Sequence, residues 1–451
     1  MKYVILVVVL GFMFSILSVI LLGSQAMFLM GLMIMLSVSV FSASYIKGIE
    51  LGGFLNVDFI SFLLGLLSLY IVLLSFFSST TVERKFSFGC VIFIVLALLF
   101  LSFFSSSAIF FYVFFESVLL PTFVLIMGWG YQPERIQAVM YMVIYTVVGS
   151  MPLLYGMMKL FFEGKSLFMC SVSLWSFKFD EIFPWFFFLA FMVKLPMFPF
   201  HIWLPKAHVE APVAGSMLLA GLLLKLGGYG MYRFSGIIEF NMWNWGVVIL
   251  LFIALWGGVL SSVVCMRQID LKCLVAYSSV GHMSFVMLGC LSNVGYGYLG
   301  ALIIMVGHGL CSSGLFAMVN MMYLNSGSRL ISLNKGYLSM MPSLSLMCFL
   351  LSSSNMACPP SLNLMGEIMV YVAGAFMSWL MIVLLGVISF MSACYSLFIY
   401  VGTQHGKSGE VYELHEKFYF LDFLNLFFHW FPLNFLFLLI FLQMLYMYLI
   451  D

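Results

Sequence analysis

The feature that most constrains this chain is a succession of apolar stretches, each about as long as a helix that crosses a bilayer. A spanning helix needs about 20 mostly apolar residues. Charged residues, Gly, Asn and Pro divide the sequence into fourteen such stretches, at 3–22, 27–46, 58–78, 86–104, 107–128, 136–161, 183–205, 212–234, 245–264, 271–291, 296–323, 338–375, 377–402 and 424–448. Because lipid cannot hydrogen-bond an exposed backbone, each stretch is expected to be helical. The sequence predicts an all-α polytopic membrane protein with about fourteen transmembrane helices.

The composition supports one transmembrane domain over residues 1–451. The chain is 64% hydrophobic and 8% charged, with a net charge of +1, whereas soluble chains are about 25% charged. These values exclude a soluble enzyme, a disordered protein and a nucleic-acid binder that relies on a basic surface. The first apolar run resembles a secretory signal, but it is span-length and no A-x-A-like site follows it. We therefore expect it to be the first membrane helix.

The distribution of basic residues predicts an orientation. The termini and the ends of the even-ranked spans hold fewer basic residues, namely Lys2, Lys47, Lys159, Lys165, Lys178 and Arg233. The ends of the odd-ranked spans hold more, namely Arg84, Lys85, Arg135, Lys206, Arg267, Lys272, Arg329, Lys335, Lys407 and Lys417. By the positive-inside rule, both termini face the outer compartment.

Prolines interrupt two of the spans. The seventh contains Lys194-Leu195-Pro196 and Pro199, and the twelfth, 338–375, contains Pro359-Pro360 followed by Glu367. We expect each to be a discontinuous helix that crosses once. Matching broken helices five spans apart indicate two inverted five-helix repeats, over 86–234 (spans 4–8) and 245–402 (spans 9–13), with 424–448 as the C-terminal helix. The alternative is that the prolines only kink ordinary helices.

Four ionisable residues lie inside apolar spans, away from their ends: Glu116, Lys194, Lys225 and Glu367. A charge at the bilayer centre costs about 3 kcal/mol or more. Such residues must pair, line water or change protonation state. Burial favours the neutral form of a lysine and a nearby carboxylate favours the charged form, so a glutamate–lysine pair of variable separation would hold and release a proton. The alternative is a static buried ion pair that fixes the packing of two helices.

Two histidines also fall inside spans, His282 in the tenth and His308 in the eleventh. A lone buried histidine is usually a satisfied core residue. Here both lie in the sequence between the two lysines and Glu367, and a neutral imidazole can pass on a proton. We expect both to take part in a relay, with water held by the hydroxyls of Ser278, Ser279, Ser312 and Ser313.

Other polar segments are less informative. The runs 132–135 and 267–272 are typical of compact loops with local ion pairs, and 201–210 is either a proton mouth or an interfacial anchor of Trp and Lys. The nine cysteines show no paired C-x-x-C or Cys/His spacing, so neither a metal nor an iron–sulfur site is expected. The sequence also lacks a phosphate-binding loop, a G-x-G-x-x-G helix start and a nucleophile–base arrangement.

Several blocks together resemble the antiporter-like subunits of respiratory complex I. These are Phe115-Glu116, Pro121-Thr122, 128–135, 194–196, 201–212, 215–217, 223–230, Asp270-Leu271-Lys272, Tyr277-Ser278-Ser279, Pro359-Pro360 and Gly366-Glu367. The resemblance covers roughly residues 80–400. Pro199 and Cys358, beside the two breaks, depart from the pattern. High Phe and Met contents also resemble chains made inside mitochondria.

The resemblance implies a proton-translocating module in the membrane arm of the NADH:ubiquinone reductase of the mitochondrial inner membrane. Glu116 and Lys194 match the family's glutamate–lysine pair, Lys225 the connecting lysine, His282 and His308 the central histidines, and Glu367 the distal acid. It further implies that flavin, iron–sulfur clusters and ubiquinone are bound by other subunits, none by this chain. The implied partners are the other membrane-arm subunits, among them neighbouring antiporter-like subunits, together with membrane lipids and protons, and no nucleic acid.

Two other functions remain open at this point. A cation/proton antiporter of the same superfamily would use the same lysines and glutamates to exchange sodium or potassium without redox chemistry. A passive scaffold would only bridge neighbouring membrane subunits, and four buried charges make that arrangement costly.

Overall fold

A computed structural model describes residues 49–51, 55–79, 82–163, 168–169, 183–237, 245–406 and 420–450. The predicted spans 3–22 and 27–46 lie outside these ranges, as do Lys2, Lys47, Lys165, Lys178, Lys407 and Lys417. Within them the protein is mostly helical, as predicted. Ten of the described helices are long and apolar enough to cross a membrane, and two shorter apolar helices accompany them, Trp185–Lys194 and Leu362–Met377.

The helices follow the predicted stretches to within a few residues over most of the described chain. They are α3 (Phe59–Phe77), α4 (Lys85–Phe104), α5 (Ala108–Ser117), α6 (Leu119–Trp129), α7 (Arg135–Phe162), α8 (Phe183–Lys194), α9 (Trp203–Glu210), α10 (Val213–Leu218), α11 (Leu224–Ile237), α12 (Trp245–Cys265), α13 (Leu271–Leu291), α14 (Gly295–Ser326), α15 (Tyr337–Met340), α16 (Pro342–Asn355), α17 (Leu362–Met377), α18 (Trp379–Gln404) and α19 (Phe420–Ile450). Two short strands, β1 (Ile49–Leu51) and β2 (Leu55–Val57), pair antiparallel before α3.

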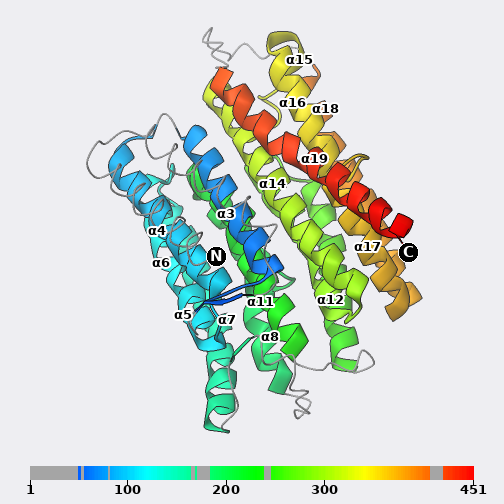
Figure 1. Ribbon diagram of the computed structural model, residues 1–451. Helices are drawn as coiled ribbons and strands as arrows, with labels where there is room; N and C mark the ends of the chain where they lie inside the picture. The colour runs from blue at the N-terminus through cyan, green and yellow to red at the C-terminus, as the bar shows by residue number, and fades with distance from the viewer. Residues whose placement is uncertain are drawn as a thin grey trace.

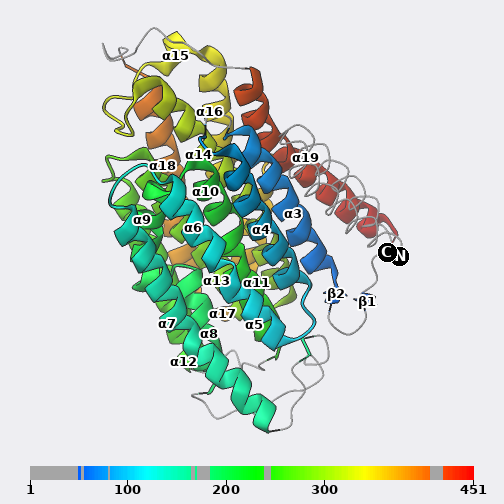
Figure 2. The same ribbon diagram turned by 90° about the vertical axis from the view of Figure 1, so that its left-hand side faces the viewer.

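The helices form a bundle with α13 and α14 in its interior. Figures 1 and 2 show α3 to α7 on one side and α16 to α18 on the other, with α19 running obliquely across the outside of α14. Nearly every residue of α13, and of the central part of α14 and of the segment from α10 to α11, is buried. The polar side chains on these helices are therefore shielded from whatever surrounds the bundle.

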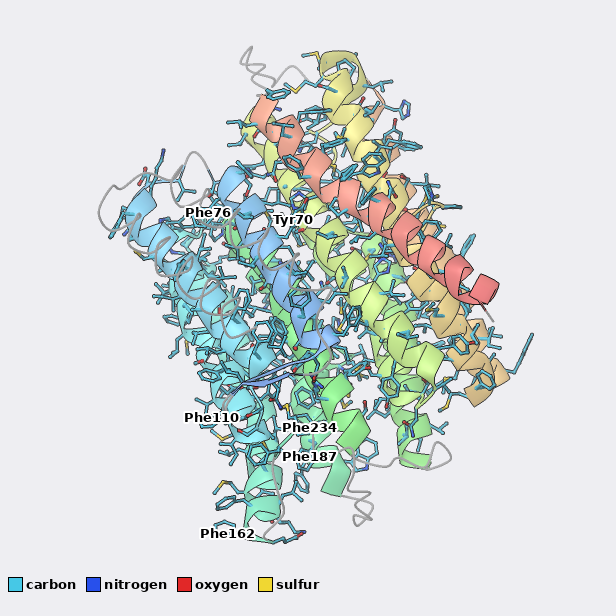
Figure 3. The ribbon with its side chains drawn as sticks, in the orientation of Figure 1. Tyr70, Phe76, Phe110, Phe162, Phe187 and Phe234 are labelled. Atoms are coloured by element: carbon cyan, nitrogen blue, oxygen red, sulfur yellow. The ribbon has the colours of Figure 1, made fainter. Side chains whose placement is uncertain are left out.

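Aromatic side chains distinguish the inside from the outside. Phe187 of α8 and Phe234 of α11 are buried with their ring centroids 5.5 Å apart. Phe110 and Phe162 lie on the periphery and are 41% and 80% exposed (Figure 3). Large apolar side chains that face outward on many helices suit a lipid environment and would be unfavourable in water.

Two helices are interrupted at prolines. The segment 195–199 separates α8 from the 3₁₀ turn η2 (Phe200–Ile202) and α9, and 356–361 separates α16 from α17. Both helices end with an amide that reaches back five residues, Met197 to the Met192 carbonyl and Cys358 to the Ser353 carbonyl. Proline lacks an amide hydrogen and clashes with the preceding turn, so Pro196 and Pro359-Pro360 prevent either helix from continuing through its break.

An ion pair ties the first helices to the interior. Arg233 of α11 contacts the Asp58 carboxylate at 2.6 Å, and its Nε donates to the Tyr229 hydroxyl at 2.9 Å. Tyr229 in turn donates to the Phe103 carbonyl of α4 at 2.9 Å. This chain of contacts fixes α11 relative to α3 and α4.

Candidate functional site

Lys194 lies at the C-terminal end of α8, directly before the break. Its side chain is buried, and Nζ donates to the Phe115 carbonyl at 2.7 Å while lying 2.9 Å from the centroid of the Phe115 ring. Glu116, which follows Phe115 in the sequence, lies within electrostatic range of Lys194 and near Ser150 of α7. Its Oε1 atom is buried without a hydrogen-bond partner in the described structure. The ammonium is thus held by a carbonyl and an aromatic face beside a carboxylate that it does not contact directly.

The Phe115 carbonyl lies next to a helix boundary. A single residue, Val118, separates α5 from α6, and Pro121 lies in the first turn of α6. Because Pro121 has no amide hydrogen, the Ser117 carbonyl loses its normal partner four residues ahead. The irregular turn lies beside Glu116. Pro121 therefore places the carboxylate next to an interruption in the hydrogen bonds of the helix.

Lys225 occupies the centre of the bundle and is fully buried. It follows η3, a π-helical segment over Leu219–Leu223. A π-segment inserts an extra residue into the turn and is often found at functional sites. The Lys225 ammonium donates to the Ala220 carbonyl, five residues back, and lies 3.0 Å from His308 Nδ1 on α14. The irregular turn therefore supplies an acceptor for the ammonium within its own helix.

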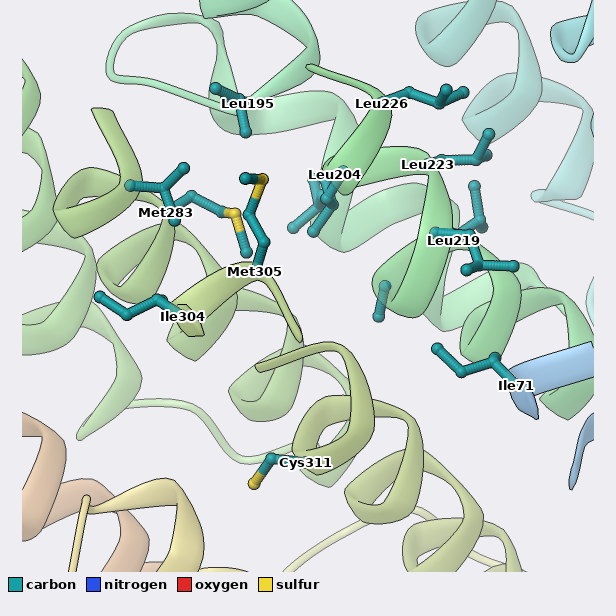
Figure 4. Packing of buried hydrophobic residues seen from close by; sticks show 14 of the residues in the cluster. Ile71, Leu195, Leu204, Leu219, Leu223, Leu226, Met283, Ile304, Met305 and Cys311 are labelled. Atoms are coloured by element: carbon teal, nitrogen blue, oxygen red, sulfur yellow. The ribbon is translucent and has the colours of Figure 1, made fainter. Parts of the chain in front are cut away.

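Two glycines after Lys225 allow this close packing. A Cβ on Gly227 would lie 3.3 Å from the Lys194 Cβ and 3.0 Å from Leu195, and one on Gly228 would lie 2.4 Å from the Met305 sulfur. Figure 4 shows Leu195, Leu226 and Met305 packed in this region, with Cys311 farther along α14. Apolar side chains thus surround the buried lysines and leave few polar neighbours.

The structure brings four of the six predicted residues into one continuous series. The series begins at Lys225, which contacts His308. The ring centroid of His308 lies 5.3 Å from that of His282, and His282 Nδ1 lies 3.9 Å from Glu367 Oε1. His282 Nε2 contacts the Tyr395 hydroxyl of α18 at 3.2 Å. Both histidines are 2% exposed or less, and Glu367 is 6% exposed. Glu116 and Lys194 form a separate group, joined to the series by the packing of Lys194 against Gly227.

A second buried polar group lies beside the series, and the sequence singled out only the part of it that lies in 201–210. It consists of His208 and Glu210 of α9, Lys272 of α13 and Arg329. His208 stacks on Phe316 with ring centroids 4.8 Å apart, and both its ring nitrogens lack partners in the described structure. His208 also lies within electrostatic range of both Lys272 and Lys225. The segment 201–210 was noted as polar, but Lys272 and Arg329 look like ordinary loop charges in the sequence.

Polar side chains in two other places bond to main-chain carbonyls. The hydroxyls of Ser278, Ser279, Ser312 and Ser313 all donate to carbonyls of their own helices, so their hydrogens are not directed at the relay. Arg135 and Lys272 donate to the carbonyls of Gly130 and Ala211. The predicted ion pairs within loops 132–135 and 267–272 are therefore replaced by contacts to main-chain oxygens.

Among the described residues, no group of three or more His, Cys, Asp or Glu side chains is arranged to hold a metal ion. The eight cysteines in this part of the chain are free thiols, four of them buried in the apolar interior. The site therefore consists of lysines, glutamates and histidines, which are groups that exchange protons.

Comparisons with known proteins agree with this arrangement. The family model of the NADH:quinone oxidoreductase and Mrp antiporter transmembrane proteins matches residues 105–392. NADH-ubiquinone oxidoreductase chain 4 of Mytilus edulis is 49% identical over 425 residues, covering 94% of this chain and 98% of that protein. The protein of the same name from Locusta migratoria is 46% identical over 391 residues, covering 85% and 87%.

Two solved structures share the fold. Respiratory complex I from Thermus thermophilus with bound NADH contains a chain that matches with a TM-score of 0.85 at 23% identity, covering 96% of this chain and 94% of that one. The Mrp complex from Dietzia sp. DQ12-45-1b matches with a TM-score of 0.80 at 17% identity, covering 92% and 84%. With the family model over more than half of its length and close relatives over nearly all of it, this multi-pass membrane chain belongs to the NADH:quinone oxidoreductase/Mrp antiporter family, alongside the chain 4 proteins of NADH-ubiquinone oxidoreductase.

Proposed function

We propose that the chain is a proton-translocating subunit in the membrane arm of respiratory complex I, in the mitochondrial inner membrane. The observation that carries this proposal is the buried series from Lys225 through His308 and His282 to Glu367. Its members are all proton-exchanging groups. Three lie in helices long enough to cross a bilayer, and Glu367 lies in α17, the shorter apolar helix after the second break. The chain 4 relatives supply the redox context, since their name describes a subunit that works with NADH and ubiquinone.

The finer architecture belongs to the same proposal. We expect fourteen transmembrane helices and two inverted repeats, 86–234 and 245–402, followed by the helix at 424–448. The matching ends of α8 and α16, each closed by an amide five residues beyond its acceptor, support the pairing of the seventh and twelfth spans. Each break then brings one ionisable group, Lys194 or Glu367, to the middle of the bundle.

Lys194 would act as a switch between two partners. In the structure its ammonium is held by the Phe115 carbonyl and ring, and a short movement would bring it to Glu116. Contact with the carboxylate stabilises the ammonium, and withdrawal favours loss of its proton. Opposing a membrane potential of 100 mV costs about 2.3 kcal/mol per proton, which equals a pKa change of under two units. When the Lys194 ammonium changes its partner in the low-dielectric interior, the change in interaction free energy is large enough to supply this cost.

The series would then pass the proton along the bundle. Lys225 donates a proton to His308 Nδ1, the histidines carry it towards Glu367, and the Glu367 carboxylate accepts it. The 3.9 Å gap between His282 and Glu367 exceeds a hydrogen bond of about 3 Å, so this step needs a small movement or one bridging water. Lys194 and Lys225 would take protons from the inner compartment, and Glu367 with its surroundings would release them outward.

His208, Glu210 and Lys272 give this uptake a route. They connect the loop around 267–272, which lies on the side predicted to be inner, with Lys225 in the interior. A histidine with two unpartnered nitrogens and a carboxylate oxygen without a partner are suited to hold water and pass protons. This supports a proton mouth at 201–210 over an interfacial anchor.

Redox chemistry would take place outside this chain. Flavin, iron–sulfur clusters and ubiquinone belong to other subunits in this proposal, and neighbouring antiporter-like subunits would contact the outward apolar faces. Quinone reduction would reach this module through a change in charge or hydration at its edge.

The first test is a native gel of gently solubilised membranes, probed for this chain and stained for NADH dehydrogenase activity. The proposal predicts that the chain runs in a large, active band. A small band without activity would contradict assembly into complex I.

The alternative function is sodium/proton or potassium/proton exchange, favoured by the structural match to the Mrp complex. The same buried lysines would serve it, but transport would be driven by a sodium gradient without NADH. Sodium-driven proton movement in vesicles that contain the purified chain would favour the antiporter. Retention of pumping after neutral replacement of both Glu116 and Lys194 would instead favour a passive scaffold.

A further inference from the structure

Buried polar atoms without partners also gather away from the series, where α14, the break between α16 and α17, and α19 meet. They are Asn355 Nδ2, Ser361 Oγ, Asn363 Oδ1, both side-chain ends of Asn425, and His429 Nε2, and none has a hydrogen-bond partner in the described structure. All five residues are 2% exposed or less. Leaving a buried polar group unsatisfied is unfavourable, and buried water normally satisfies such groups.

His429 is the titratable member of this polar cluster. Its Nδ1 lies 2.8 Å from the Asn425 carbonyl, one turn earlier in α19. A carbonyl can only accept, so Nδ1 carries the hydrogen and Nε2 of the neutral ring is an acceptor. This acceptor is the nitrogen that is buried without a partner. The ring is therefore anchored by one nitrogen and offers the other for a proton.

The polar cluster adjoins the series through α14. Cys311 lies about one turn after His308, and its sulfur is 3.4 Å from Ser354 Oγ and 3.7 Å from Asn355 Oδ1. Asn355 also lies beside His282. About one further turn along α14, Gly314 has no side chain, and a Cβ there would lie 3.0 Å from the His429 Cβ. Polar atoms therefore extend from His282 and His308 to Cys311, and His429 packs against α14 about one turn farther along.

The break itself belongs to the polar cluster. Asn363 Nδ2 donates to the Ser354 carbonyl at 2.9 Å, across the interruption between α16 and α17. Its Oδ1 would lie 2.3 Å from a Cβ on Gly307, the residue before His308. The amide of Asn434 on α19 lies between the Pro360 carbonyl and the Trp430 indole nitrogen. Helix α19 thus contacts the break that precedes Glu367.

We propose that His429 is a further proton-carrying group of this module, joined to His308 and His282 by water held on Cys311, Ser354, Asn355 and Asn363. A protonated water delivers its proton to His429 Nε2, giving an imidazolium that keeps its Nδ1 bond to Asn425. The same proton later returns from Nε2 to the water chain, so no other reactant is needed. The inference rests on the proposed function and adds a side branch to its relay.

The test uses His429→Gln in the assembled complex, with Lys225→Met as the benchmark and His405→Gln as the matched control. Glutamine can still hydrogen-bond but cannot carry a proton, whereas His405 is exposed at the end of α18. Protons moved per NADH oxidised are measured in sealed vesicles, beside native-gel assembly and the uncoupled NADH oxidation rate. We expect His429→Gln to assemble and to lose at least half as much proton transfer as Lys225→Met, and His405→Gln to lose none.

The outcomes distinguish a failure of the side branch from a failure of the proposed function. Full pumping by His429→Gln with a defective Lys225→Met overturns the branch alone, whereas full pumping by Lys225→Met overturns the proposed function. If His429→Gln does not assemble, Cys311→Val decides, because it removes the sulfur contact and leaves His429 in place. Lowered pumping in Cys311→Val supports the branch, and unchanged pumping overturns it.

Discussion

The two ends of the proposed relay differ in how their charges are partnered. At Glu116 and Lys194 the ammonium is bound to a carbonyl and an aromatic ring and does not reach the neighbouring carboxylate. Each end has one buried carboxylate oxygen without a hydrogen-bond partner in the described structure, Glu116 Oε1 and Glu367 Oε1. From Lys225 to Glu367, each ionisable group faces the next. The first arrangement resembles an open switch and the second a connected path. In the proposed mechanism, control would reside at the Lys194 end and conduction at the Lys225 end.

The largest effect is expected from cutting the connected path. Lys225→Met keeps the length of the side chain and removes both the ammonium and its contact with His308, so proton transfer through this module should be abolished. The measurement is protons moved per NADH oxidised in sealed vesicles. Lys85→Met, at an exposed lysine where α4 begins, is the matched control and should pump normally. Unchanged pumping by Lys225→Met in an intact assembly would refute conduction through this residue.

The switch is tested by Glu116→Gln. The neutral amide cannot attract the ammonium, so Lys194 should stay on the Phe115 carbonyl, and coupled pumping should fall by about tenfold, which corresponds to about 1.4 kcal/mol. Uncoupled NADH oxidation should change less than coupled oxidation. A loss of both activities in equal proportion would indicate a structural role for Glu116 and not a switching one.

A packing change should affect the junction between the path and the break. In Gly307→Ala the new methyl group would meet Asn363 Oδ1 at 2.3 Å, and overpacking of this kind costs about 1–3 kcal/mol. We expect a lower melting temperature of the complex and slower coupled oxidation. Gly236→Ala has nothing within 4 Å of its new methyl group and should leave both values unchanged. Equal behaviour of the two variants would contradict close packing at Asn363.

The smallest effect is expected at Tyr395. Tyr395→Phe removes the hydroxyl that lies 3.2 Å from His282 Nε2 and keeps the ring. A single hydrogen bond contributes about 0.5–1.5 kcal/mol, so coupled pumping should fall by about two- to tenfold, less than in Lys225→Met. Tyr371→Phe, which removes a hydroxyl bonded to Ser389, tests whether any lost hydroxyl on these helices has the same effect.

The sequence was sufficient for much of this fold because lipid imposes a simple rule. Long apolar runs became helices within a few residues of the predicted bounds, from α3 to α19, and prolines marked both breaks. The ionisable residues inside spans were found because charges are rare there. Their contacts were not predictable, since they depend on which helices meet.

Three features could not be predicted from the sequence, and each has an identifiable reason. Lys272 and Arg329 sit at span margins, where charges usually reach water, and their burial comes from distant segments that cover them. The serine hydroxyls donate to carbonyls of their own helices. The residue pattern of a helix does not show whether a hydroxyl bonds within that helix or to a neighbouring one. The π-segment at 219–223 consists of ordinary helix-forming leucines with one Ala and one Gly, so its extra residue leaves no mark in composition.

That π-segment sets the register of everything after it. One residue turns an α-helix by about 100°, and the wide turn at 219–223 absorbs one extra residue. If this segment kept its length but became a regular α-helix, Lys225 would rotate by about that angle away from His308. The same rotation would bring Leu226 to the tight contact now made by Gly227. The width of this turn is therefore as much a part of the site as the lysine itself.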